Sequence, residues 1–169
     1  MSDFLPADYE APTGQSNYMK LHQGENRFRV LSRPIMGLLA WKDKTPHRFH
    51  TTGEVSGDFE GTPKHFWAFA VWNVKDESVQ VLEITQSSIQ NAITNLSRDP
   101  DWGSPFEYDI KIIRKGEGLE TEYSIQPAPK SPVTAVAKQA LIKKPVNLEA
   151  LYTGDDPFET DGAKDDLPY

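Results

Sequence analysis

Alternation of apolar and polar residues predicts β-strands along much of the chain. In residues 26–31, Arg27 and Arg29 fall on one face and Phe28 and Val30 on the other, which is the two-residue period of a half-buried strand. Further segments have the same period, or a short run that is apolar throughout, and also have the composition of strands. They are residues 35–41, 65–73 and 79–84.

The period then changes to that of a helix. Ile89, Ile93 and Leu96 recur at helical spacing, and Ser87 with Gln90 forms a capping-box pattern at the start. Two more strands follow, joined by a glycine-containing turn, at residues 108–114 and 122–126. Residues 26–31 and 35–41 count as one strand with a break at Pro34. The order is then three strands, a helix and a hairpin. We therefore expect a mainly β protein with an OB fold, a five-stranded Greek-key barrel with one helix between strands 3 and 4.

Composition divides the chain into four regions. Residues 1–16, rich in Pro, Gly and small polar residues, predict a flexible N-terminal arm, and residues 17–130 predict the OB-fold domain. Residues 131–154 predict a linker with short helical segments, and residues 155–169 an acidic disordered tail. Inside the domain, residues 42–63 predict a long polar loop, and loops of that length are usually functional.

Charge is distributed unevenly along the chain, whose net charge is −7. Residues 18–50 hold seven Lys and Arg against two acids, whereas residues 151–169 hold six acids against one Lys. There is no cysteine, which excludes disulfides, thiolate zinc sites and cysteine nucleophiles. The N-terminus lacks the pattern of a signal peptide, and no apolar run reaches the length of a membrane span. We expect a cytoplasmic protein.

Cations and aromatic residues alternate between residues 27 and 72, a combination suited to single-stranded nucleic acid. Lys and Arg follow the phosphates, and flat side chains stack on bases of any sequence. In the 65–73 strand, Trp67 and Phe69 share one face, Phe66 and Trp72 share the other, and either face could contact DNA. The candidate DNA-binding residues are Arg27, Arg29, Trp41, Lys42, Lys44, Arg48, Phe49, Lys64, Trp67, Phe69, Trp72 and Lys111.

Signals for other chemistry are weak. His47 and His50, with His65 and His22, have a spacing that suggests a metal site, but without cysteine we expect no metal and place these histidines beside the DNA. No Gly-rich phosphate loop or nucleophile elbow is present. We therefore expect no catalytic residue, no cofactor and no enzymatic activity.

Two sets of residues resemble known families. The terminal Asp165-Asp166-Leu167-Pro168-Tyr169 resembles the acidic tail tip of bacterial single-stranded-DNA-binding proteins, which typically ends Asp-Asp-Ile-Pro-Phe. Several blocks of residues, in the same order, are similar to phage-encoded single-stranded-DNA-binding replication proteins. These blocks are residues 18–21, 24–31, 65–73, 82–89 and 108–123.

This resemblance covers roughly residues 17–130 and the tail, and it implies several properties. They are an OB fold and binding of single-stranded DNA with little sequence preference, during phage DNA replication, recombination and repair in the cytoplasm of the bacterial host. It also implies that residues 165–169 recruit partner proteins, such as a polymerase, helicase-primase, recombinase or nuclease. Family members that bind zinc use cysteines, so zinc binding does not carry over to this chain.

Two other classes fit part of the sequence. An OB or β-sandwich module that binds carbohydrate or RNA would also be rich in aromatic residues, but a carbohydrate-binding module would not need the polarity of charge. An acidic inhibitor that mimics DNA would explain the net charge, but its acids should be spread over the folded domain. Residues 15–130 instead hold fourteen bases against fifteen acids.

Overall fold

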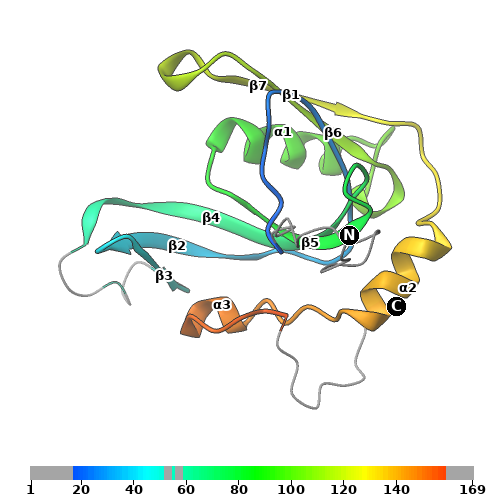
Figure 1. The fold of residues 1–169 in the computed structure, drawn as a ribbon. Coiled ribbons are helices and arrows are strands. Elements are labelled where there is room, and N and C mark those ends of the chain that lie inside the picture. Colours follow the sequence, from blue (N-terminus) through cyan, green and yellow to red (C-terminus); the bar gives the residue numbers. More distant parts are fainter. Residues whose placement is uncertain (1–16, 52–54, 56–58, 159–169) are drawn as a thin grey trace, which may run out of the picture.

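The computed structural model describes residues 17–51, 55 and 59–158, which form one antiparallel sheet with helices on its two faces (Figure 1). Seven strands lie in this part of the chain, in the order β3-β2-β4-β1-β6-β7, with β5 paired to β4. The predicted mainly β class is therefore confirmed. The elements are β1 (Gly24–Val30), β2 (Ile35–Lys42), β3 (Thr45–Phe49), β4 (Glu60–Asn73), β5 (Ser78–Ile84), α1 (Ser87–Arg98), η2 (Pro105–Glu107), β6 (Ile110–Lys115), η3 (Gly118–Glu120), β7 (Glu122–Pro127), α2 (Ala135–Lys143) and α3 (Ala150–Thr153).

Two predicted regions fall outside the described residues. They are the N-terminal arm, residues 1–16, and residues 159–169 of the acidic tail, which include the terminal motif. None of the helices in the described ranges has the length and hydrophobicity needed to cross a membrane.

The prediction of a long loop over residues 42–63 is wrong. β3 lies within this segment, and β4 already begins at Glu60. Asp43 and Lys44 make the tight turn between β2 and β3, both at positive φ (51° and 64°), although neither is the glycine that usually marks such a turn. Pro46 is tolerated in β3 because β3 is an edge strand, where a missing N–H costs no ladder hydrogen bond.

Helix α1 covers one face of the sheet, which we call the inner face. Its Ile89 and Ile93 are buried against Phe28, Val71 and Ile110 from three different strands. The removal of these side chains from water stabilises the fold, by roughly 1.5–3 kcal/mol for each large apolar residue that is fully buried. The helical period of residues 87–98 thus produces the contact that the sequence predicts.

The predicted capping box at the start of α1 is wrong. Gln86, not Ser87, is the N-cap residue, and it makes no side-chain capping hydrogen bond. The Gln90 side chain points to the sheet instead and donates to the carbonyl oxygens of Ile84 (2.9 Å) and His65 (3.2 Å). Gln90 is buried, so these bonds satisfy an amide that would otherwise lack partners and tie α1 to β4 and β5.

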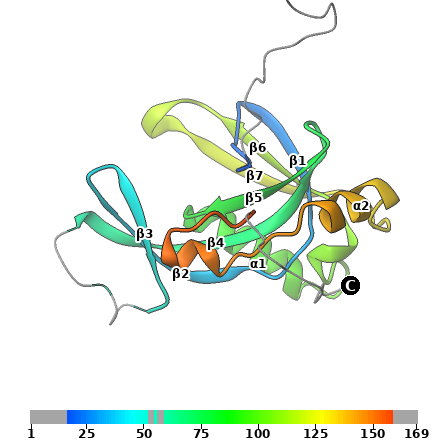
Figure 2. The same ribbon diagram turned by 60° about the horizontal axis from the view of Figure 1, so that its bottom comes forward.

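Residues 131–158, which we call the strap, cover the opposite, outer face of the sheet (Figure 2). The strap contains both helical segments that the sequence predicts for this region. Leu141 of α2 is buried in a cluster with Trp72, and Leu151 of α3 is buried in a cluster with Phe66. The region predicted as a linker therefore packs on the sheet and completes its outer core.

Tyr108 leads to a prediction about stability at high pH. Its ring is fully buried, its hydroxyl donates to the carbonyl of Gly103 (3.0 Å), and burial raises its pKa above the usual tyrosine value of 10.0. The contribution of the neutral Tyr108 hydroxyl to the free energy of unfolding is therefore fully present below pH 10. It is lost as the pH rises from 10 to the raised pKa of the folded protein, because in this range only the unfolded state loses the proton. Tyr108→Phe should cost about 1 kcal/mol at neutral pH and make the alkaline decline shallower.

Urea unfolding between neutral pH and about pH 11 measures this effect. Burial also raises the pKa of Tyr18, so a smaller decline should persist in the variant. An unchanged slope with pH in Tyr108→Phe would contradict the assignment.

Candidate nucleic-acid interface

One end of the sheet extends away from the rest of the fold (Figures 1 and 2). It consists of residues 38–51 and 59–65 of β2, β3 and the first half of β4, and we call it the finger. Half of the candidate DNA-binding residues lie on it. They are far apart in the sequence, and only the pairing of the strands brings them together. These residues are Trp41, Lys42, Lys44, Arg48, Phe49 and Lys64.

On the outer side of the finger, Arg48 and Lys64 lie opposite Leu39, so the three side chains share a face. Arg48 donates two hydrogen bonds to the carboxylate of Glu83 (2.7 and 3.1 Å), and its side chain is only 11% exposed. Its charge is thus already compensated within the protein. Lys64 is exposed, and Trp41, on the same side of β2, is 44% exposed.

On the inner side of the finger, Leu38 lies opposite Phe49 and His65. Phe49 is half-buried and packs edge-on against Phe59, with 5.6 Å between ring centroids. Lys42 shares this side because alternate residues of a strand point the same way, and it is exposed. The pleat therefore divides the predicted finger residues between two faces.

Neither face of β4 is broadly accessible to DNA along residues 66–73, because both faces are mostly covered. Phe66 is fully buried and Trp72 is 9% exposed beneath the strap, while Phe69 is 3% exposed in the core beside α1. Burial thus excludes Phe69 and Trp72 from direct contact with a nucleic acid. Trp67 is only half-buried, and it lines a groove on the inner face.

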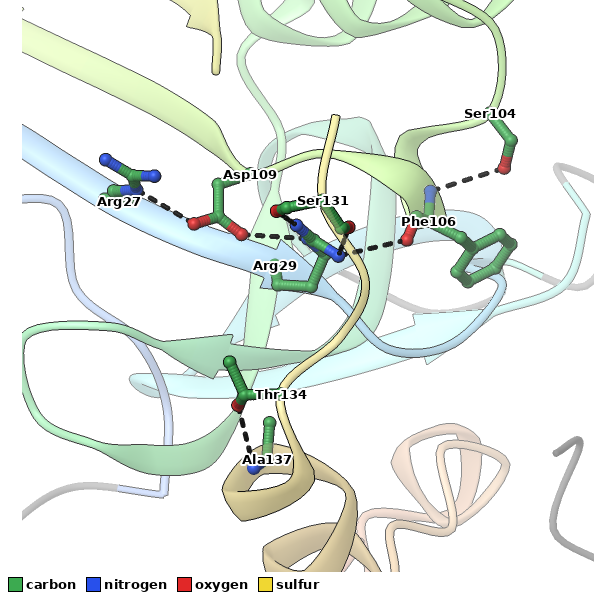
Figure 3. A network of polar contacts seen from close by, with 8 residues as sticks. All are labelled: Arg27, Arg29, Ser104, Phe106, Asp109, Ser131, Thr134 and Ala137. Carbon is green, nitrogen blue, oxygen red and sulfur yellow. Dashed lines mark hydrogen bonds and ion pairs between the residues drawn. The ribbon is translucent and has the colours of Figure 1, made fainter. Parts of the chain in front are cut away.

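Arg29 is also a correction to the candidate set. It is 3% exposed, and its guanidinium donates to Asp109 (2.8 Å), to the carbonyl of Phe106 (3.3 Å) and to the carbonyl and hydroxyl oxygens of Ser131 (2.9 and 2.8 Å; Figure 3). Asp109 accepts a second hydrogen bond from Arg27 (2.9 Å), whose side chain is 39% exposed. Arg29 is thus used to fix the start of the strap, and its burial keeps the guanidinium out of reach of a phosphate.

Arg27 and Lys111 stand opposite each other on β1 and β6, at some distance along the sheet from the finger. Arg27 is partly neutralised by Asp109, and Lys111 is half-buried. The twelve candidate residues therefore do not form a single surface. They divide between the finger, the β1–β6 pair, the interior and the inner-face groove that Trp67 lines.

A groove of about 310 Å³ on the inner face was missed by the sequence analysis. Met36, which is 46% exposed, and Phe106, which is 37% exposed, border it together with two exposed arginines, Arg33 and Arg98. Its residues come from β1, the β1–β2 turn, β2, β4, α1 and η2. Only the fold brings these segments together, so no local sequence signal marks the site.

The histidines are dispersed in the structure. His50 stacks on Tyr152 of the strap, with 3.7 Å between ring centroids, and His65 lies next to the Gly37 carbonyl (3.2 Å). Within the described ranges no group of three or more His, Cys, Asp or Glu residues is placed to hold a metal ion. The His47 ring packs against Phe59 at 5.5 Å.

The fold and this surface define a mainly β domain with an exposed finger that carries cations and an exposed tryptophan. Over 63 residues, or 37% of this chain, the sequence is 32% identical to a protein of Escherichia phage T5 described as a probable ssDNA-binding protein. The matched segment spans 24% of the length of that protein. No family model matches the chain, and no solved structure matches it.

Proposed function

We propose that this protein binds single-stranded DNA with little sequence preference and that the finger makes the main contact. The observation that carries the proposal is the exposed Trp41 beside the exposed Lys42 and Lys44 at the tip of the finger. A stacking platform next to exposed cations is what a binder of single strands needs, because phosphates and base faces are present in every sequence. The similarity to the probable ssDNA-binding protein of phage T5 supports the same ligand.

We further propose that the domain is an OB fold. Its support is the ladder order β5-β4-β1-β6-β7, which places α1 between the third and fourth strands of such a barrel. In the described residues, β5 and β7 share no ladder, so the sheet stays open where a full barrel would close. Helix α1 contacts β7 beside this opening, and Tyr18 makes a parallel bridge to Val81 on β5.

The proposed role is to coat exposed single strands without catalysis, in the cytoplasm of a phage-infected bacterial host. In this role the acidic residues 165–169 recruit replication or recombination proteins. Charge and composition support this part of the proposal, since the motif combines two carboxylates with Leu-Pro-Tyr. The motif lies outside the described residues.

Fluorescence anisotropy with labelled oligo-dT and a matched duplex tests the proposal. The wild-type protein should bind the single strand more tightly, with an affinity that falls as salt rises. Lys42→Gln/Lys44→Gln/Lys64→Gln should weaken binding about ten-fold at low salt and reduce the salt slope by about 2, since each lost phosphate contact removes about 0.7.

The control removes the same amount of charge from exposed lysines outside the finger, as Lys75→Gln/Lys138→Gln/Lys143→Gln. It should bind like the wild type. Absence of wild-type binding at low salt would refute the function, and an equal loss in both triple variants would refute the finger as the site.

A further inference from the structure

The groove on the inner face has an apolar floor and two apolar, exposed edges. Trp67 of β4 forms the accessible floor, above the almost fully buried Phe69 and Ile93, while the exposed Met36 and Phe106 border the groove. Large side chains that stay exposed around a hollow mark a binding site more often than scattered ones do. The volume of about 310 Å³ is at the lower limit of small-ligand sites, large enough for one flat group.

Two cations from different elements line this hollow. Arg33 comes from the β1–β2 turn, and Arg98 is the last residue of α1. Both are exposed, and neither guanidinium has an ion pair or hydrogen bond within the described part of the chain. By contrast, the guanidinium groups of Arg29 and Arg48 form ion pairs with carboxylates. An apolar slot lined by two such guanidinium groups suits a flat group attached to anions.

The groove continues the inner side of the finger. Met36 and Trp67 stand opposite each other, and two residues further along the strands Leu38 stands opposite His65. These side chains share one face, which leads to Lys42 at the tip of the finger. Beyond the finger the outer face offers no comparable path, because the strap covers it there and carries the exposed carboxylates of Glu149 and Asp155.

Phe106 is held in place by the network in Figure 3. Its backbone N–H donates to the Ser104 hydroxyl (3.3 Å), and its carbonyl accepts from Arg29. The ring therefore stands on a fixed backbone although η2 is only one turn long. A rigid aromatic edge loses little conformational entropy when a ligand stacks on it.

We propose that this groove receives one unstacked base of a single strand that passes from the tip of the finger, where Trp41 lies, onto the inner side of the finger. Phe106 and Trp67 contact the base, and Arg33 and Arg98 bind the phosphates on its two sides. This inference rests on the proposed function and adds a second stretch to the DNA path, beyond the finger. It follows that affinity rises with oligonucleotide length until the strand covers both finger and groove.

The test compares oligo-dT lengths from about 4 to about 20 nucleotides, which brackets the site sizes of OB domains. For the longer strands, Phe106→Ala should weaken binding about ten-fold, as expected for the loss of one stacked base. Phe106→Leu keeps an apolar side chain without a flat ring and should lose nearly as much. Arg33→Gln/Arg98→Gln should reduce the salt slope by about 1.4.

All these variants should bind the shortest strands like the wild type, because those strands occupy the finger alone. Lys138→Gln/Lys143→Gln removes the same charge from exposed positions on α2 and should bind every length normally. A second readout is photocrosslinking of 5-iodo-deoxyuridine strands, which should attach to peptides that contain Trp67 or Phe106. Thermal unfolding confirms that each variant is folded.

Three outcomes would overturn the inference. If the wild type binds single strands and the groove variants match it at every length, the groove is not on the DNA path. If a labelled peptide of residues 155–169 binds and the groove variants lose that peptide but not DNA, the occupant is an acidic peptide. If the wild type binds no single strand, the proposed function fails and this inference fails with it.

Discussion

Replacing Arg29 with methionine should lower the free energy of unfolding by about 3 kcal/mol. The substitution keeps an unbranched apolar stem but removes the guanidinium that donates to Asp109, to the Phe106 carbonyl and to Ser131. Breaking a buried ion pair by removing one partner typically costs about 3–5 kcal/mol. The lower value applies because Asp109 is 16% exposed and keeps its hydrogen bond to Arg27.

Arg27→Met is the matched control, because Arg27 binds the same carboxylate from a side chain that is 39% exposed. Exposed pairs contribute roughly 0–1 kcal/mol, so this variant should remain close to the wild type. Urea unfolding measures both changes. Hydrogen exchange should also become faster in α2 in Arg29→Met, since Ser131 anchors the start of the strap. Equal destabilisation in the two variants would show that burial does not distinguish these arginines.

The contrast between Arg27 and Arg29 shows where the sequence pattern stops being informative. The alternation of β1 correctly places both side chains on one face of a strand. It carries no signal that one of them is buried, because the partner that covers Arg29 is Ser131, 102 residues further along the chain. Charge on an alternating strand is therefore a good predictor of the face and a poor predictor of exposure.

The finger illustrates a different limit. Residues 42–63 have the composition of a loop, since Pro46, Gly57, Gly61 and Pro63 interrupt the apolar pattern. An edge strand tolerates proline, and the turn at Asp43 and Lys44 lacks the usual glycine, so local rules pointed to a loop. Pairing with β2 decides the outcome, and that pairing is not visible in the segment itself.

The strand 65–73 is apolar on both faces because two different layers cover it. α1 packs on the side of Phe69, and the strap packs on the side of Phe66 and Trp72. The sequence correctly indicated a strand that is apolar on both faces. It left one face open to DNA, because the second covering layer lay in residues predicted to be a linker. For the same reason the groove could not be anticipated, since its walls come from segments between Val30 and Phe106.

Gly37→Ala should destabilise the protein by about 3 kcal/mol and weaken binding of single-stranded DNA. A Cβ atom at residue 37 would overlap the carbonyl oxygen of Phe49 and crowd the ring of Phe66. Overpacking costs typically 1–3 kcal/mol, and the upper value applies because the nearest atom is backbone, which no rotamer change can move away. β3 must therefore shift away from β2, which disrupts the pairing of Leu38 with Phe49.

Gly61→Ala is the matched control on the same finger. Gly61 has a positive φ of 71°, but a Cβ atom there would meet nothing within 4 Å, so the cost is limited to about 1–2 kcal/mol of backbone strain. Hydrogen exchange separates the two cases, since Gly37→Ala should expose the amides of β3 while Gly61→Ala leaves them protected. Because Lys42 and Lys44 are held at the tip by the β2–β3 pairing, Gly37→Ala should also lose DNA affinity beyond what its lower stability explains. Retained affinity with unprotected β3 amides would show that the finger binds DNA without its hairpin geometry.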